Sequence, residues 1–395
     1  MTICCSDLLQ LKNFQKIQLL AGEAGLYRQV TLPYLSTATT ISRWVHGGEL
    51  LFINGAGIKT DENSLCLLMH QAVDLKLAGM VIILNKKYIT TIPPSLIDLA
   101  NRSSFPLFEM PWEVKFIDVL QEILQLIMDH RELYEKHVLF LDQLLFSNAQ
   151  DYSLEELAGY YSIKVRNFRT VAAISIDDSN HRQWDAIKRD IVHTLKRYTQ
   201  KTQSEIVCKD YINMVICLAM SDTTDSMKQL DASLNETFAK LETHYPQAGL
   251  KLGVGRVCQK EDSIRQSFID AQKVLALMDK NLLAASALHY SDLGVYRLLS
   301  EIESAEAIQN YCMENIGRLI EADRGNHSEL VKTLRFYLYN NCNLLKTSQA
   351  LFIHRNTLIY RLNLIKDILE KDLSDALVRH ELFLSLIASE FLGNP

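Results

Sequence analysis

The 395-residue sequence lacks the marks of several protein classes. None of its eight cysteines forms a C-x-x-C pair, and no histidine lies at zinc-ligand spacing from a cysteine pair, so no metal site is predicted. Charged residues interrupt every apolar stretch well before 18 residues, which argues against a membrane span. The N-terminus has no basic region followed by an apolar core, as a signal peptide would. We therefore expect a cytoplasmic protein with reduced, buried cysteines.

Net charge and length set broad limits. The formal charge of −6 argues against coating of nucleic acid by bulk charge, although an acidic chain can still carry one local basic surface. The length predicts two to four domains, and 48% hydrophobic residues suffice for several cores.

Proline is scarce after position 111, and the earlier prolines separate apolar runs from helical patterns. The runs Leu50–Ile53, Met80–Leu84 and Leu107–Met110 alternate with helical patterns over 63–77 and 95–102. Fully apolar runs of four or five residues between helices are typical of a buried parallel sheet. Residues 1–112 are therefore predicted to form an α/β domain.

The segment from Glu113 to Ala158 contains neither glycine nor proline and is predicted to be one long helix. Apolar residues recur at seven-residue intervals, and Arg131 interrupts their second row. Two interpretations stay open: a helix packed on its own domain, or a dimerising helix between domains. The seam, meaning the row of side chains through which the helix is expected to make its contacts, consists of Leu120, Leu124, Ile127, Tyr134, Val138, Leu141 and Leu145.

The middle segment predicts the order β-α-β-β-α-β-α, which indicates a ferredoxin-like sandwich over 159–298. Its central hairpin is expected to turn around Lys209 and Asp210. Nucleotide cyclases carry a glycine-rich, acidic hairpin there, whereas this one has no glycine and one acid. Close backbone approach to phosphate and paired metal carboxylates are therefore missing. We expect no catalytic residue and no cofactor, and an enzyme of the nucleotide-cyclase type is the less favoured alternative.

Residues 331–366 contain six basic residues and no acid, a local reversal of charge. Two short helices are predicted there, over 344–352 and from about Arg355, with an apolar stripe on the second. This is the composition of a helix-turn-helix, whose second helix enters the DNA major groove. Arginine can pair with guanine and asparagine with adenine, whereas the first helix is placed to contact phosphate. The candidate DNA-binding residues are Lys346, Thr347, His354, Arg355, Asn356, Thr357, Tyr360 and Arg361.

Two alternatives to DNA binding are open. Asn356 can instead be the N-cap of the second helix, with the basic residues forming only a solvated surface. The terminal helices can also bind a protein, which would make the chain a ligand-responsive adaptor; a salt titration on duplex DNA separates these cases.

The run from Ala350 to Leu362, with Asp372–Asp375 and a closing helix to Phe391, resembles the C-terminal helix-turn-helix of PucR/CdaR-type bacterial transcription regulators. The segments 47–52 and 105–117 resemble the PucR domain, and the middle resembles a degenerate GGDEF-like domain. The resemblance implies an α/β sensor (1–112), a linker helix (113–158), a GGDEF-like α+β domain (159–298) and an all-α C-terminal domain (299–395). It also implies operator DNA and a small effector as partners, the effector being a purine catabolite or another nitrogenous or carboxylate metabolite. We expect a homodimer or higher oligomer, because one helix-turn-helix reads one half-site.

One candidate for effector binding precedes the first buried strand. Gly47, Gly48 and Glu49 can form a loop that faces a ligand, or a tight turn that only leads into the strand. Neither the effector, the operator nor the direction of regulation follows from the sequence.

Overall fold

The computed structural model describes residues 3–147, 153–177, 184–199, 204–259, 263–326 and 328–393. Parts of the expected helices, at 148–152, 183 and 262, lie outside these described residues. The chain divides into two compact units, one of residues 1–166 with 178–237 and one of residues 167–177 with 238–395. The finer division into four regions stays a prediction.

The N-terminal region is a five-stranded sheet in the order β2-β7-β6-β5-β4. Neighbours among the last four pair in parallel, and β2 is antiparallel to β7. Every residue of β5 and β6 is buried, so the predicted parallel sheet is confirmed. The strands are β2 (Gln18–Ala21), β4 (Pro33–Ser36), β5 (Leu50–Ile53), β6 (Gly79–Ile83) and β7 (Leu107–Met110).

Both faces of this sheet are covered. On one face lie α2 (Glu62–Asp74) and α3 (Pro94–Arg102), whose apolar sides pack on Leu51 and Ile82. The other face carries α1 (Cys5–Leu8) and the start of α4 (Phe116–Phe146). A short antiparallel pair, β1 (Ile3–Cys4) with β3 (Gln29–Val30), lies beside α1. This region is a layered α/β domain, as the apolar runs predicted.

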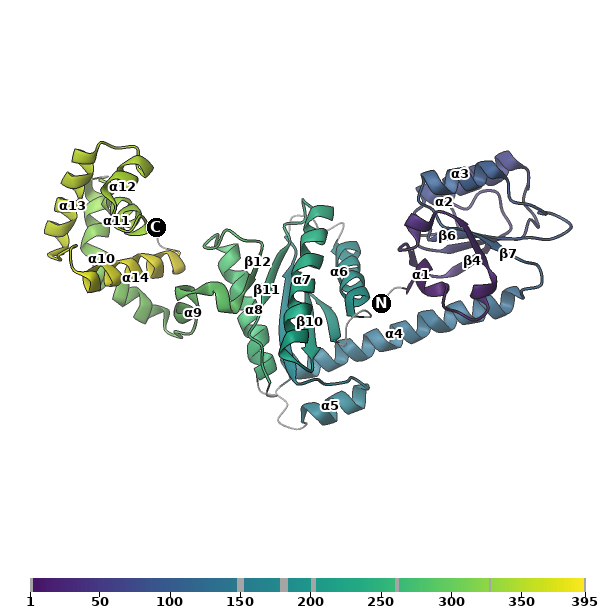
Figure 1. The fold of residues 1–395 in the computed structure, drawn as a ribbon, viewed down its shortest axis with the longest axis horizontal. Helices are drawn as coiled ribbons and strands as arrows, with labels where there is room; N and C mark the ends of the chain where they lie inside the picture. The colour runs from purple at the N-terminus through teal and green to yellow at the C-terminus, as the bar shows by residue number, and fades with distance from the viewer. Residues whose placement is uncertain are drawn as a thin grey trace. The chain divides into compact units, whose positions relative to one another are not determined.

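Helix α4 is continuous over 31 residues (Figure 1). Val119 and Ile123 in its first half belong to the N-terminal core, whereas Phe140, Leu141 and Leu145 are buried near its end. Its second half contacts β9 (Glu205–Tyr211). The predicted single helix over 113–158 is wrong for its last part, because α4 ends at Phe146 and residues Leu154–Tyr161 form a separate helix that Ser153 caps. Whether α4 also serves as a dimerising helix stays a prediction.

The hairpin of β9 and β10 (Met214–Ser221) turns at Ile212 and Asn213, not at Lys209 and Asp210 as expected. Lys209 is accommodated in the strand because its ammonium pairs with Asp142 and lies over two aromatic rings. Ile212 takes the positive φ of 48° that the turn needs. The first unit also contains the helices α5 (Leu154–Tyr161) and α6 (Trp184–Thr199).

In the second unit, β8 (Phe168–Ser175) pairs antiparallel with β11 (Lys251–Val254), which pairs in parallel with β12 (Ala287–His289). Helix α8 (Ser263–Asp279) packs on β8 and β11. With α7 (Thr224–His244), the order along the chain is β8-α6-β9-β10-α7-β11-α8, so the predicted order is confirmed.

The C-terminal region is entirely helical (Figure 1). Its core gathers Leu334, Leu358, Ile365, Leu382 and neighbouring leucines from several helices. The helices of this region are α9 (Val295–Ser300), α10 (Ala305–Asn326), α11 (Leu330–Tyr339), α12 (Leu344–Ala350), α13 (Arg355–Leu369) and α14 (Ala376–Phe391).

All eight cysteines are free thiols, and six of them are buried. None of the described helices combines the length and hydrophobicity that crossing a membrane requires. Among the described residues, no three His, Cys, Asp or Glu side chains are grouped as metal ligands would be.

Candidate DNA-binding site

Helix α12 begins at a side-chain cap. The Asn343 carboxamide oxygen accepts hydrogen bonds from the backbone amides of Leu345 and Lys346, each at 3.0 Å. This satisfies two amides that would otherwise lack a partner at the start of the helix. The cap fixes the direction of the first turn, which carries the exposed Lys346.

The connection from α12 to α13 is short because the chain reverses through one left-handed residue. Phe352 has φ of 54°, and the amide of Ile353 donates to the carbonyl of Ser348 at 3.0 Å. A left-handed residue after a helix is usually glycine, since a side chain there is strained. The Phe352 side chain is nevertheless 96% exposed.

Helix α13 is capped by His354. The Nδ1 atom of His354 accepts a hydrogen bond from the backbone amide of Asn356 at 3.3 Å. The alternative that Asn356 is the N-cap is therefore wrong. Among the described residues, no hydrogen-bond partner is found for the Asn356 side chain, which is exposed.

The two faces of α13 differ as the spacing predicted. Leu358 and Ile365 are fully buried, and Leu362 and Leu369 are nearly so. Tyr360 is 67% exposed on the other face. The N-terminal surface of α13, as we call it here, consists of the exposed residues His354, Arg355, Asn356, Thr357 and Tyr360.

Two cations at this end of the domain carry no counter-charge. Among the described residues, ion pairs of the C-terminal helices engage six cations but neither Lys346 nor Arg355. These six are Arg318, Lys332, Arg335, Arg361, Lys366 and Lys371. The side chains of Lys346 and Arg355 are exposed, so their charges are available to a phosphate or a base edge.

Thr347 and Arg361 do not belong to this surface. Thr347 is fully buried, and its hydroxyl donates to the carbonyl of Asn343 at 2.7 Å. The guanidinium of Arg361 donates to Glu329 at 3.3 Å and to Thr333 at 3.2 Å, with its side chain 20% exposed. A hydrogen bond from Lys332, together with Arg361, lowers the pKa of Glu329. These contacts tie Arg361 to α11.

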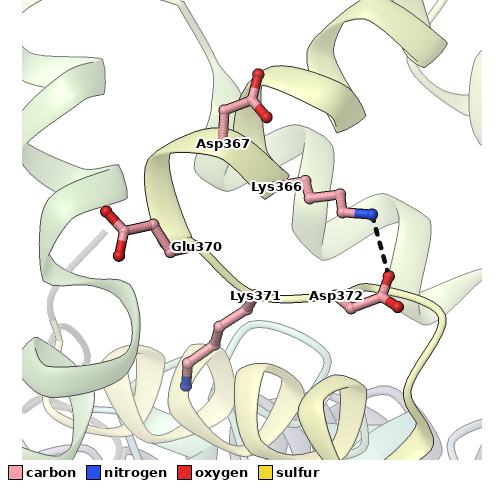
Figure 2. Close-up of a pocket in the computed structure, with 5 residues that line it drawn as sticks. All are labelled: Lys366, Asp367, Glu370, Lys371 and Asp372. Atoms are coloured by element: carbon pink, nitrogen blue, oxygen red, sulfur yellow. Dashed lines mark ion pairs between the residues drawn. The ribbon is translucent and has the colours of Figure 1, made fainter.

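A pocket lies at the other end of α13 (Figure 2). Lys366 pairs there with Asp372 at 3.4 Å, and hydrogen bonds from Ser374 lower the pKa of Asp372 to about 2. The pocket is lined by Lys366, Asp367, Glu370, Lys371 and Asp372. This mixture of signs, with three acids, is unfavourable for phosphate, so the pocket is not part of the candidate interface.

The loop of Gly47, Gly48 and Glu49 precedes β5 and so lies at the amino end of the parallel strands. The buried Glu49 carboxylate accepts hydrogen bonds from the amides of His46 (2.8 Å) and Gly47 (2.9 Å). Both glycines have positive φ. These contacts favour the tight turn, and effector binding by this loop stays a prediction.

The hairpin of β9 and β10 contacts α4. Tyr134 on α4 donates to the Asp210 carboxylate, which also pairs with Lys188 at 3.6 Å. Although burial opposes it, the hydrogen bond from Tyr134 and the charge of Lys188 lower the pKa of Asp210. The one acid of the hairpin thus makes structural contacts.

Sequence reasoning missed two contributors: Asn343, and His354 as a cap. The asparagine could have been found, because Asn followed by an apolar, basic turn is a common helix start. Histidine is a rare cap and gave no signal. The position of Phe352 did give one, because many helix-turn-helix motifs have glycine there, although phenylalanine itself is a rare left-handed residue.

Three stretches of the chain match known families. Residues 7–127 match the purine catabolism regulatory protein-like family. Residues 147–277 match the GGDEF-like domain, and residues 330–388 match the PucR C-terminal helix-turn-helix domain. The last match contains α12, α13 and the turn between them.

Three curated relatives carry names of regulatory proteins. The chain is 30% identical to the proline-responsive transcriptional activator PutR of Bacillus subtilis, over 44% of this chain and 43% of that protein. It is 20% identical to the purine catabolism regulatory protein of B. subtilis, over 93% and 96%. It is 24% identical to the carbohydrate diacid regulator of Escherichia coli, over 60% and 61%. The chain thus spans less than two thirds of two of these relatives.

The chain carries the PucR N-terminal domain, the GGDEF-like domain and the PucR C-terminal helix-turn-helix domain, and it is homologous to the Bacillus PucR and PutR regulators. These findings support a DNA-binding transcriptional regulator.

Proposed function

We propose that the protein binds operator DNA by inserting the N-terminal surface of α13 into the major groove, and that a small metabolite bound to the N-terminal domain controls this binding. The observation that carries the proposal is the exposed surface of His354, Arg355, Asn356, Thr357 and Tyr360, together with Lys346, for which the described part of the chain offers no ion pair. Such a helix end can contact both phosphate and base edges. DNA binding implies action in the cytoplasm of a bacterium.

Each residue of the surface has a proposed role. Arg355 and Asn356 present the groups that pair with guanine and adenine, whereas Lys346 contacts phosphate. Thr357 and Tyr360 offer hydroxyls to bases or phosphate. Because Thr347 and Arg361 are held by intramolecular contacts, we assign them to the support of the site.

The effector is proposed to be a small metabolite. The relatives' names refer to proline, purine catabolism and carbohydrate diacids, so they favour this class without selecting a member. In parallel sheets, ligands bind at the carboxyl ends of strands. There the loops after β5 and β6 are joined by the Asn85 side-chain amide, which donates to the carbonyl of Asn54 at 2.9 Å. We propose these loops as the preferred site for the effector, with the loop of Gly47, Gly48 and Glu49 as the alternative.

No catalytic role is proposed for the GGDEF-like domain. Its hairpin acid, Asp210, is engaged by Tyr134 and Lys188, which supports docking of α4 in place of nucleotide chemistry.

The test is footprinting of the full chain on genomic DNA with and without candidate metabolites, followed by a salt titration on the fragment found. We expect a protected site and an affinity that falls steeply with salt, as phosphate contacts require. An affinity for duplex DNA that does not change with salt concentration would argue against phosphate contacts and favour a protein-binding adaptor. Asn85→Ala should weaken the effector's influence while leaving DNA affinity in its absence unchanged, and the same influence in wild type and variant would place the effector elsewhere.

A further inference from the structure

Two thiols lie against each other in the hairpin of β9 and β10. Cys208 and Cys217 are directly opposite in the antiparallel register, and their sulfur atoms are 3.2 Å apart. Directly opposite residues of an antiparallel pair point to the same side of the sheet, with Cα atoms about 4.5–5.5 Å apart. A disulfide bridges Cα atoms that are about 4.4–6.8 Å apart. The two thiols can therefore be joined without a change in the register of the strands.

This arrangement differs from that of other buried cysteines in the chain. The thiols of Cys5, Cys258 and Cys312 donate to backbone carbonyl oxygens at 3.3–3.4 Å. A buried cysteine of that kind acts as a small apolar residue with a weak donor. A thiol in contact with a second thiol has a further reaction open to it, which is the formation of an S–S bond.

Opening of the hairpin gives a small oxidant access to the pair. Both cysteine side chains are buried, so peroxide cannot reach the sulfur atoms while the strands are closed. Among the described strands, however, β9 pairs with β10 alone. A strand at the edge of a sheet has unpaired backbone groups on one side, and such segments open locally without global unfolding. Hydrogen peroxide is small enough to enter during such an opening.

We propose that Cys208 and Cys217 form a redox-sensitive pair, which hydrogen peroxide converts into an intramolecular disulfide and a thiol reductant restores. The thiolate of one cysteine attacks peroxide, which yields a sulfenic acid and a hydroxide that takes up the proton lost by that thiol. The second thiol then attacks the sulfenic sulfur, the S–S bond forms, and the sulfenic hydroxyl leaves with the thiol proton as water. Two thiols are oxidised, and one peroxide is reduced to two waters.

The same hairpin contacts α4 through the two residues that follow Cys208. Lys209 pairs with Asp142, and Asp210 accepts a hydrogen bond from Tyr134. A disulfide at Cys208 would fix β9 against β10 in the register in which both contacts form. Oxidation should therefore slow the separation of α4 from the hairpin. The inference concerns this hairpin and α4, and it does not depend on DNA binding.

Trypsin makes the disulfide directly visible, because it cuts after Lys209, between the two cysteines. The reduced full chain is treated with hydrogen peroxide, its remaining thiols are alkylated in denaturant, and the digest is analysed by mass spectrometry without reductant. We expect peptides 202–209 and 210–228 as one species, lighter than their sum by the two hydrogens lost. A thiol reductant should separate them. The same treatment in urea should give much less of this species, since the strands no longer hold the cysteines opposite each other.

Two serine variants provide a matched comparison. Cys217→Ser should abolish the joined species, whereas Cys258→Ser alters a buried cysteine outside the pair and should leave the joined species unchanged. Circular dichroism checks that both variants are folded, and Cys217→Ala takes the place of a serine variant that is not.

Hydrogen exchange measures the effect on α4. In the wild type, the amides of residues 134–146 should exchange at least about tenfold more slowly after oxidation, because opening of the hairpin is restricted. The Cys217→Ser variant, which cannot form the disulfide, should show no such change on treatment with peroxide.

Separate, alkylated peptides from peroxide-treated wild type would overturn the proposal, provided that the dose oxidises the partly exposed Cys66 and Cys342. Equal yields of the joined species in the native protein and in urea would overturn it as well, because the fold would then contribute nothing to the pairing. A joined species without slower exchange in α4 would overturn the inferred effect on α4.

Discussion

The Nδ1 atom of His354 accepts a hydrogen bond from the backbone amide of Asn356 at 3.3 Å, and this contact separates capping from recognition at the start of α13. His354 caps the first turn of the helix, and Asn356 keeps an exposed carboxamide. An asparagine that also capped the helix could not offer the same oxygen to adenine.

This division of roles predicts that two substitutions affect stability differently. His354→Ala should lower the free energy of unfolding of the C-terminal domain by about 1 kcal/mol, because the cap is lost. Asn356→Ala should leave stability nearly unchanged. Chemical denaturation of both variants measures the difference, and a larger loss for Asn356→Ala would show that the asparagine is the cap after all.

Lys346 is expected to contact phosphate. Lys346→Ala should weaken binding to operator and random DNA alike, and it should reduce the slope of log affinity against log salt by about 1. Lys366, on the far end of α13 and paired with Asp372, provides the matched control. If Lys366→Ala changes the slope as much as Lys346→Ala does, the interface extends over the whole helix and our assignment fails.

Phe352 stores backbone strain in the turn. Because glycine adopts a positive φ without cost, Phe352→Gly should raise the free energy of unfolding by up to about 1 kcal/mol, less the entropy that glycine adds to the unfolded chain. Phe352→Ala retains the strain and should give no gain. Thermal denaturation distinguishes them, and destabilisation by glycine would reveal a stabilising role of the ring.

The pair of Lys209 and Asp142 fastens α4 to the hairpin. The Lys209 side chain is only 9% exposed and lies over the rings of Phe146 and Tyr211. Asp142→Asn should cost about 1–2 kcal/mol by leaving a nearly buried charge without its partner, reduced by the exposure of Asp142. Adding Lys209→Met should recover most of the loss, since methionine keeps the packing. An unfolding midpoint that does not recover would show that the ammonium has further essential contacts.

Apolar patterning predicted the parts of the fold that burial alone decides. The runs at β5 and β6 and the stripe Leu358, Leu362, Ile365 and Leu369 lie where their spacing placed them. Patterning failed where a polar side chain satisfies a tertiary contact. Lys209 and Asp210 are typical turn residues, yet partners on α4 hold them in a strand.

The candidate site was predictable as a location but not as a set of roles. The run of basic residues without an acid over 331–366 predicted that the start of α13 is the DNA-binding surface. It could not show that Thr347 is buried or that Arg361 turns toward Glu329, because both depend on the packing of α11 and α12. The seven-residue row of α4 likewise did not reveal that Leu141 and Leu145 are buried where α4 contacts β9, because a repeat does not show which surface it meets.

The central claim is that the N-terminal surface of α13 reads DNA sequence. Fluorescence anisotropy with the footprinted operator and a scrambled duplex, at one fixed salt concentration, measures it in the wild type and in Arg355→Ala, Asn356→Ala and Lys366→Ala. We expect the first two variants to lose about 1–3 kcal/mol on the operator and much less on the scrambled duplex, with the third unchanged. Equal losses on both duplexes for Arg355→Ala and Asn356→Ala would contradict the account.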